Sequence, residues 1–318
     1  MSDWPHQIVG VRSVIRRLEA GVGRVILAAP TGAGKSRMMH RLIEHYGSAT
    51  IYLNRKMLLE QLCRGLAEAG IEHGIQAAGY APDIDAAVQV AMVQTVEQRW
   101  SKGEMHLHDG RLVILDECHS EKGERMASVI DAHVEAGQKF VGVTATPVGC
   151  GDMADHLVVA GTNSQLRECG ALLRAVHYAP DEPDMKLLKS PTVGVQGIRD
   201  AYREKYRTVL FGRVVDHYQR LNPDGLPTIL FASGVDESLW FAQEFCRAGF
   251  RAAHVDGERV WINGETFEAT DQSRDALSAA SEHRDVEIIC NRFVLREGID
   301  MPWLAHGILA CTFGSVNG

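Results

Sequence analysis

The chain has 318 residues, of which 45% are hydrophobic and 23% are charged, a composition typical of soluble globular proteins. This length exceeds what one hydrophobic core usually holds, so two domains are expected. The formal net charge of −8 argues against a passive nucleic-acid coat, although a local groove on an acidic body can still hold a strand. No apolar run reaches the ~20 residues of a membrane span and no signal pattern opens the chain, so we expect a cytoplasmic protein without a membrane partner.

The seven cysteines form no Cys-x-x-Cys pair, which favours reduced thiols in a reducing compartment. His106 and His108 suggest a metal site only if a second ligand pair accompanies them. A polar surface loop explains them better, so we expect no zinc site in this chain.

Short apolar runs alternate with amphipathic stretches in the first half of the chain. The predicted strands here are residues 24–30, 49–54, 87–95, 111–117 and 139–146. The predicted helices are residues 35–46, 55–70 and 125–137, the last two ending in glycine. Apolar β-runs separated by helices indicate a parallel sheet with helices on both faces.

The alternation stops after Pro147 and resumes near residue 227. Between these points, the polar residues 179–184 have the composition of a connector. The strands predicted beyond it are residues 227–233, 251–257, 286–291 and 306–312, with helices at 235–249 and 271–283. We therefore predict an α/β protein with one domain at 1–160, a connector at 161–205 and a second domain at 206–318.

Residues 29–36, Ala-Pro-Thr-Gly-Ala-Gly-Lys-Ser, follow an apolar strand and open a helix, as a phosphate-binding loop requires. Its backbone N–H groups would surround phosphate oxygens at Thr31, Gly32, Ala33 and Gly34. Lys35 would contact the β- and γ-phosphates, and Ser36 would hold Mg²⁺. The strict pattern has glycine where this chain has Ala29. The alternative, a glycine-rich turn that binds nothing, is disfavoured by the strand–turn–helix setting.

The apolar run at 111–115 ends in the acidic pair Asp116-Glu117. Carboxylates at the carboxyl end of a parallel strand lie where ligands bind in open α/β sheets. Asp116 can hold Mg²⁺ through water, and Glu117 can orient and deprotonate an attacking water. Such pairs also occur where a strand simply enters a polar loop, but a preceding phosphate loop favours the catalytic interpretation. Cys118 and His119 are too few to enclose a metal.

The segment Asp-Glu-Cys-His at 116–119, with the phosphate loop and Thr-Ala-Thr-Pro at 144–147, resembles superfamily 2 helicases of the DEAD/DEAH-box type. Further segments match the same family in order along the chain, at residues 5–7, 52–56, 93–95, 228–233, 254–257 and 291–302. Within the superfamily the chain looks most similar to bacterial and phage helicases of the RadD type. The narrower resemblance comes from Arg-Glu-Gly-Ile-Asp at 296–300 and Cys-Gly-Ala-Leu at 169–172.

The resemblance implies two tandem RecA-like P-loop NTPase domains that bind ATP and Mg²⁺ between them and hydrolyse ATP to move along a single strand. Gln7 would read adenine, and Gly298 and Asp300 would face the nucleotide from the second domain. His119, Thr144 and Thr146 would couple nucleotide state to strand contacts. The strand itself would be held by Asn54, Arg55, Lys56, Thr95 and Ser233. The resemblance favours single-stranded DNA, and RNA is possible.

Two other functions share this motor: an ATP-gated clamp on nucleic acid, and the translocating subunit of a restriction or remodelling complex. The Asp116-Glu117 pair argues against the clamp, because Glu117 is needed for hydrolysis and not for binding. The family's closing arginine motif is expected a few residues after Ser315, whereas the sequence ends at Gly318. The resemblance therefore implies a fragment whose second domain is incomplete and whose ATP hydrolysis is weak. At the start of the chain, Trp4 precedes the segment at 5–7. Its side chain would stack on adenine or pack as a partly buried aromatic staple.

Overall fold

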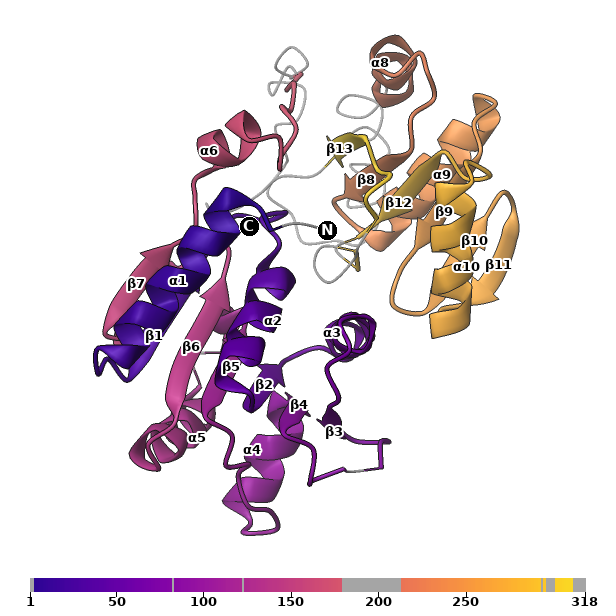
Figure 1. Ribbon diagram of the computed structural model, residues 1–318. Helices are drawn as coiled ribbons and strands as arrows, with labels where there is room; N and C mark the ends of the chain where they lie inside the picture. Colours follow the sequence, from indigo (N-terminus) through magenta and orange to yellow (C-terminus); the bar gives the residue numbers. More distant parts are fainter. Residues whose placement is uncertain are drawn as a thin grey trace, which may run out of the picture. The chain divides into compact units, whose positions relative to one another are not determined.

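A computed structural model describes residues 3–81, 83–121, 123–178, 213–292, 294–295 and 301–310. The expected connector at 179–184 lies outside these ranges, as do Gly298 and Asp300. The chain divides into two compact units, Met1–His177 and Tyr178–Gly318 (Figure 1). The first unit includes residues 161–177, assigned above to a connector, because helix α6 (Asn163–Glu168) buries Leu166 in the first unit's core.

The first unit contains a seven-stranded sheet whose paired strands all run parallel. The strand order is β3-β4-β2-β5-β6-β1-β7. The bounds are Arg24–Ala28 for β1, Ala49–Leu53 for β2, Gly74–Gln76 for β3, Val88–Met92 for β4, Leu112–Asp116 for β5, Lys139–Thr144 for β6 and His156–Val159 for β7. This parallel α/β architecture confirms the predicted fold class.

Helices cover both faces of this sheet, as predicted. They are α1 (Pro5–Glu19), α2 (Lys35–Tyr46), α3 (Lys56–Glu68), α4 (Val93–Ser101) and α5 (Glu124–Glu135), with short 3₁₀ turns at Cys118–Ser120 and Gly151–Met153. One apolar core joins the sheet to α1, α2 and α3, through side chains such as Leu18, Leu42 and Leu66. The core on the opposite face joins it to α4 and α5, through side chains such as Val96 and Val129.

The predicted strand at 87–95 is wrong in its second half. Strand β4 ends at Met92, and helix α4 begins at Val93, so Thr95 lies in a helical first turn. Val93 and Val96 are both buried three residues apart, and Trp100 packs against the same core, a helical spacing and not a strand spacing. Helix α1, which no prediction included, has Pro5 at its first position.

The second unit contains a six-stranded sheet in the order β11-β10-β9-β12-β8-β13. Its strands are β8 (Thr228–Ala232), β9 (Ala252–Val255), β10 (Arg259–Ile262), β11 (Glu265–Glu268), β12 (Ile288–Asn291) and β13 (His306–Ala310). One core packs α8 (Val214–Leu221) and α9 (Val235–Arg247) against it through Tyr218, Phe241 and Phe245, and a second core contains Leu277 of α10 (Asp271–Glu282). The unit thus also has an α/β architecture.

The second sheet is mixed, whereas the sequence analysis predicted parallel sheets. Strands β9, β12, β8 and β13 are parallel, but β10 is antiparallel to both β9 and β11. The hairpin between β10 and β11 turns through Asn263 (φ 47°) and Gly264 (φ 106°). Two consecutive positive φ values define the tight turn that matches strand twist, and Asn-Gly is the sequence that adopts it most readily. Among the described residues, no helix has the length and apolar composition to cross a membrane.

Candidate nucleotide-binding site

The phosphate loop connects the carboxyl end of β1 to the amino end of α2. The Ala29 N–H donates a hydrogen bond to the Thr144 carbonyl over 3.0 Å, which joins the start of the loop to the end of β6. Gly32 and Gly34 have φ values of 80° and 79°, a region where a side chain is strained. Lys35 is the first residue of α2, so the loop places its cation at a helix amino terminus.

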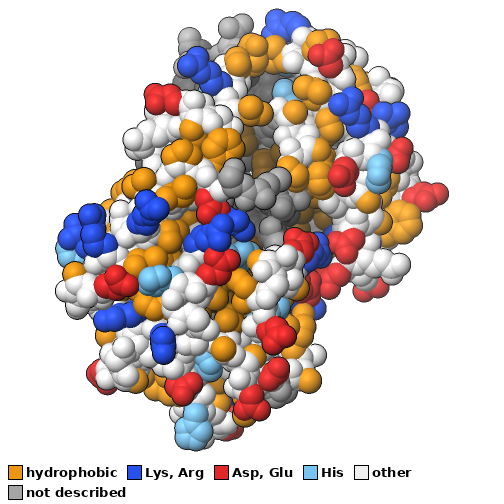
Figure 2. All heavy atoms as spheres, viewed as in Figure 1, with side chains coloured by type: hydrophobic (Ala, Val, Ile, Leu, Met, Phe, Trp, Pro, Cys, Tyr) orange, Lys and Arg blue, Asp and Glu red, His pale blue; other side chains and the backbone are white. Residues whose placement is uncertain are grey.

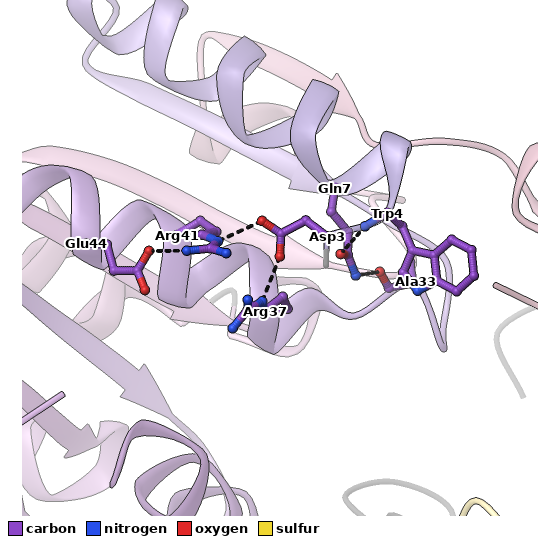
Figure 3. Close-up of polar contacts among 7 residues, drawn as sticks. All are labelled: Asp3, Trp4, Gln7, Ala33, Arg37, Arg41 and Glu44. Atoms are coloured by element: carbon purple, nitrogen blue, oxygen red, sulfur yellow. Dashed lines mark hydrogen bonds and ion pairs between the residues drawn. The ribbon is translucent and has the colours of Figure 1, made fainter. Parts of the chain in front are cut away.

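The first turn of α1 holds the phosphate loop from the side. Gln7 Nε2 donates to the Ala33 carbonyl over 3.0 Å (Figure 3). His6 Nε2 lies 2.9 Å from the same oxygen. The Trp4 N–H donates to Gln7 Oε1 over 2.9 Å, which is one half of a helix capping box. A Cβ atom on Gly34 would overlap Gln7 Nε2. Glycine at this position therefore allows the Gln7 amide to approach the loop.

Three of the predicted motifs meet through one chain of polar contacts. Lys35 Nζ lies 3.5 Å from Glu117 Oε1, and the other carboxylate oxygen, Glu117 Oε2, lies 3.3 Å from His119 Nδ1. His119 Nδ1 is also 2.9 Å from Thr144 Oγ1, which accepts a 3.0 Å hydrogen bond from the Thr146 N–H. The structure thus brings together the catalytic and coupling residues predicted in the first domain.

The acidic turn has a strained backbone that a neighbouring strand supports. Glu117 adopts a left-handed conformation with φ 47°, which is uncommon for a residue with a side chain. Ser120 Oγ donates to the Glu117 carbonyl over 2.9 Å, and Asn54 Nδ2 donates to Ser120 Oγ over 2.7 Å. Asn54 was expected only to contact nucleic acid. Through Ser120, it is also attached to the turn that carries Glu117.

Asp116 carries its charge in an unfavourable environment. Burial raises its pKa to about 6, and the neighbouring Glu117 carboxylate adds to the rise, while Lys35 and the Glu117 N–H offset it only in part. The Glu117 N–H donates to Asp116 Oδ1 over 3.0 Å. A pair of partly buried carboxylates beside a single lysine suits a divalent cation, because the oxygen donors carry more negative charge than Lys35 balances.

The first-unit residues that are predicted to contact nucleic acid lie at the carboxyl ends of two adjacent β-strands, β2 and β4. Arg55 and Lys56 follow β2 and begin α3, and Thr95 follows β4, which pairs with β2. Gln94 Nε2 donates to the Asn54 carbonyl over 3.2 Å and links the two segments. Lys56 also forms a 3.5 Å ion pair with Glu60. Ser233, in the second unit, is exposed directly after β8.

Surface charge does not mark a path for nucleic acid on the face shown in Figure 2. On the face shown in Figure 2, Lys and Arg side chains are interspersed with Asp and Glu side chains. This mixture is consistent with the net charge of −8. On this face, contacts with nucleic acid would therefore come from individual polar groups.

Asp3, Arg37 and Arg41 are not among the residues predicted from the sequence. Asp3 Oδ1 accepts a 2.8 Å hydrogen bond from Arg37 Nε, and Asp3 Oδ2 accepts one of 2.7 Å from Arg41 Nε. Arg41 also donates to Glu44 over 2.7 Å. The two arginines are four residues apart, which places them on one face of α2, but their shared partner could not be identified from spacing.

A second missed contact involves Leu172. A Cβ atom on Gly32 would meet Leu172 Cδ2 at 2.7 Å, so the side chain of Leu172 closely covers the phosphate loop. The Leu172 N–H donates to the Leu166 carbonyl over 3.0 Å, which fixes the turn after α6. No sequence signal predicted this contact, because residues 161–205 were assigned to a connector.

In the second unit, a buried polar network occupies the segment 254–257 that the resemblance singled out. His254 Nδ1 lies 2.7 Å from Ser238 Oγ, and His254 Nε2 lies 3.0 Å from Asp256 Oδ2. Arg259 Nε donates to the same carboxylate oxygen over 3.0 Å. The His254 side chain is fully buried, so this network connects α9 to β9 and the start of β10.

Comparisons with known proteins agree with this fold. Residues 1–149 match the family model described as Type III restriction enzyme, res subunit. The chain is 25% identical over 288 residues to a 51.5 kDa protein of Lactococcus phage (isolate 7-9), and covers 56% of that relative's length, or about half. The match includes 87% of the present chain.

Two solved helicase structures share the fold. The Hef helicase domain of Pyrococcus furiosus has a TM-score of 0.57 and 14% identity, covering 96% of this chain and 88% of that one. Dbp5 of S. cerevisiae, in a variant bound to RNA and ADP BeF3, has a TM-score of 0.62 and 14% identity, covering 99% and 80%. At 14% identity these similarities show a shared fold, with two α/β units of the tandem RecA-like kind.

Proposed function

We propose that the chain is an ATP-dependent helicase or translocase motor that hydrolyses ATP to move along a single strand, with DNA as the favoured substrate. The observation that carries the proposal is the contact chain from Lys35 through Glu117 and His119 to Thr144. It joins a phosphate-binding cation, a candidate general base and a coupling residue. Such a connection is what a motor needs in order to convert nucleotide state into a change elsewhere.

Glu117 is the proposed base that orients and deprotonates the attacking water. Its carboxylate is shared between Lys35 and His119, at 3.5 and 3.3 Å. Phosphate oxygens would draw Lys35 away and leave Glu117 oriented by His119 alone. Because His119 also contacts Thr144, this exchange would change the segment at 144–146 as well.

Ser36 and Asp116 are the proposed Mg²⁺ ligands. The raised pKa of Asp116, due to burial and to Glu117, supports this assignment because a cation at this position would relieve the unbalanced charge. When bound, Mg²⁺ would supply positive charge to the phosphate oxygens. The protein's own part is to hold Asp116 ionised and correctly oriented, through the 3.0 Å hydrogen bond from the Glu117 N–H.

Gln7 is the proposed adenine-reading residue. Within the described residues its amide makes two hydrogen bonds, one donated to Ala33 and one accepted from Trp4. A glutamine amide has two N–H groups and two acceptor lone pairs, so one donor and one acceptor can still serve a ligand. That combination matches the N7 acceptor and N6 donor of adenine.

Asn54, Arg55, Lys56 and Thr95 are the proposed strand contacts of the first unit, and Ser233 that of the second. Contacts with the phosphate backbone of nucleic acid are independent of base sequence, which suits a protein that must track any nucleic-acid strand. Gly298 and Asp300, expected at the nucleotide from the resemblance, belong to the same proposal. The RadD-type resemblance favours DNA.

A second candidate is a translocating subunit of a restriction or remodelling complex, which moves on nucleic acid without separating strands. The match of residues 1–149 to the type III restriction res-subunit model favours it. The same motor serves both activities. A strand-displacement assay and a triplex-displacement assay on matched DNA substrates distinguish them, since a pure translocase displaces the third strand without unwinding the duplex.

The proposal is tested by steady-state ATP hydrolysis with single-stranded DNA, duplex DNA and RNA in parallel. We expect hydrolysis to be stimulated by single-stranded nucleic acid, most strongly by DNA, and to be lost in Glu117→Gln. Ion pairs far from the site provide a control, because Asp131→Asn removes only the Arg24–Asp131 contact of 2.6 Å. Hydrolysis in Glu117→Gln at the rate of the unmodified chain would contradict the proposal.

A further inference from the structure

The carboxylate of Asp3 bridges two arginines on the helix that follows the phosphate loop (Figure 3). We infer that Asp3 is a positioning residue that holds the turn carrying Gln7 at the correct place for base recognition. The inference rests on the proposed nucleotide-binding function. It assigns to Asp3 a role in adenine selectivity that acts through Gln7, without contact between Asp3 and the nucleotide.

The bridge is well formed for a charged contact near the surface. Asp3 uses each carboxylate oxygen for a different arginine, with N–O distances of 2.8 Å to Arg37 and 2.7 Å to Arg41. The Asp3 side chain is only 15% exposed, and the arginine side chains are 36% and 37% exposed. Hydrogen bonds that pair opposite charges are about twice as strong as neutral ones. This contact is therefore stronger than an ordinary surface ion pair.

The arginines belong to a rigid element that begins at the phosphate loop. Helix α2 starts at Lys35, and Arg37 and Arg41 lie one turn apart on it. Asp3 therefore fixes the chain before α1 to the same helix that carries the phosphate-binding lysine. The hydrogen bond from Arg41 to Glu44 over 2.7 Å adds a further restraint on the orientation of Arg41.

From Asp3 the restraint passes to Gln7 within one helical turn. Trp4, the next residue, is the N-cap of α1, and its N–H fixes Gln7 Oε1 over 2.9 Å. The opposite end of the Gln7 amide is fixed by the Ala33 carbonyl. The turn is thus attached by Asp3 to α2, and by His6 and Gln7 to the Ala33 carbonyl of the phosphate loop. Loss of the Asp3 attachment leaves the contacts with Ala33 to hold the turn.

The expected consequence is a loss of discrimination between adenine and guanine. An amide reads adenine with one donor and one acceptor, whereas guanine presents two acceptors, N7 and O6. If the turn is loosened, Gln7 samples other orientations and the adenine-specific pair of hydrogen bonds weakens. Contacts of the phosphates with the loop backbone and Lys35 are made elsewhere, so affinity for guanine nucleotides should change little.

The charge on Asp3 persists over the whole neutral range. Hydrogen bonds from Arg41 and Arg37 lower the pKa of Asp3 below its ordinary value, and they outweigh the opposing effect of burial. The positioning effect should therefore not vary with pH between 6 and 8. A change in adenine selectivity over this interval would have to come from another group.

The test is calorimetric binding of ADP and GDP to the full 318-residue chain and to variants at position 3. Asp3→Asn should weaken ADP roughly five- to tenfold and GDP less than about twofold, since the amide keeps one acceptor oxygen and replaces the other by an NH₂ group that cannot accept from an arginine. Asp3→Glu should restore most of the ADP affinity. Asp131→Asn, which removes an ion pair with Arg24 of similar length, should change neither affinity.

Three results would overturn the inference: unchanged ADP affinity in Asp3→Asn, equal loss of ADP and GDP affinity, or an unmodified chain that does not distinguish the two. Equal loss would mean that Asp3 acts on the phosphate loop and not on base recognition. If Asp3→Asn fails to fold, Arg41→Gln decides, because it keeps the Arg37 contact and should give an intermediate, ADP-selective loss. ATP hydrolysis is measured separately, so a chain that selects ADP without hydrolysing ATP counts against the proposed motor and not against Asp3.

Discussion

Replacing Asp116 by asparagine should stabilise the nucleotide-free protein while removing its activity. Burial and the Glu117 charge raise the pKa of Asp116 from 3.8 to about 6. Below pH 3.8 the carboxyl group is protonated in both the folded and the unfolded state, so its raised pKa costs no stability. As the pH rises, the unfolded state ionises first and the folded state loses relative stability, until the loss is complete above pH 6. A shift of about two units corresponds to about 3 kcal/mol of destabilisation at pH 8. Asparagine avoids this cost because it never ionises.

The substitution is nearly isosteric, so the effect is not masked by repacking. The amide oxygen of asparagine can accept the same hydrogen bond from the Glu117 N–H, which is 3.0 Å long at Asp116. Urea denaturation at pH 8, monitored on the first unit, should give a free energy of unfolding higher by up to about 3 kcal/mol for Asp116→Asn. At pH 5 the gain should fall to roughly half, since the wild-type carboxyl group is then mostly protonated when folded.

The pH dependence of Mg²⁺-dependent nucleotide binding tests the functional role of the same carboxyl group. In the presence of Mg²⁺, the affinity of the unmodified chain for nucleotide should decrease as the pH falls through 6, because the proton and the cation compete for Asp116. Asp116→Asn should remove this dependence together with hydrolysis. A variant that is less stable than the unmodified chain at pH 8, or equally more stable at pH 5 and pH 8, would refute the reasoning.

Other substitutions test the remaining contacts. Glu117→Gln should keep nucleotide binding and lower hydrolysis by about 10²–10⁴-fold in steady-state assays, because only the base is removed. Lys35→Ala should weaken nucleotide binding and hydrolysis together in the same assays. Gly34→Ala should cost about 1–2 kcal/mol in backbone strain and displace Gln7, so calorimetry should show weakened ADP binding, whereas unchanged ADP affinity would contradict the proposed contact. Arg55→Ala should weaken single-strand binding for all sequences alike and reduce the slope of log affinity against log salt by about 0.7, whereas a change confined to one base sequence would contradict the backbone-contact assignment.

Sequence patterns located elements best where the chain itself marks their ends. Helix α2 was predicted at 35–46 and begins and ends at those residues, because Gly34 and Gly47 both adopt left-handed conformations beside it. The motif residues Lys35, Glu117, His119 and Thr144 were also identified from sequence, since the phosphate loop and the acidic pair follow strands. Their mutual distances could not be predicted, because they depend on β1, β5 and β6 lying side by side.

The elements that were missed show two different limits. The β10–β11 hairpin contains Asn263-Gly264, a recognisable turn signal, so a search for turn residues would have found it. Helix α1 has proline at its first position and glutamine at its third, which is a recognisable helix start. In contrast, nothing local pairs Asp3 with Arg37 and Arg41, because that contact exists only after α1 and α2 have packed together.

The strand order of the first sheet has a consequence for synthesis on the ribosome. Strand β1, which leads into the phosphate loop, pairs with β6 and β7, so Arg24 is aligned with Phe140, and Val25 with His156. At a translation rate of about 5–20 residues per second, β1 would wait roughly 6–25 s for its first partner. During that interval an apolar strand has no neighbour on either edge, and such edges promote aggregation. The candidate nucleotide site should therefore be one of the last parts of the first unit to form, and nascent chains should depend on chaperones until residue 159 has emerged.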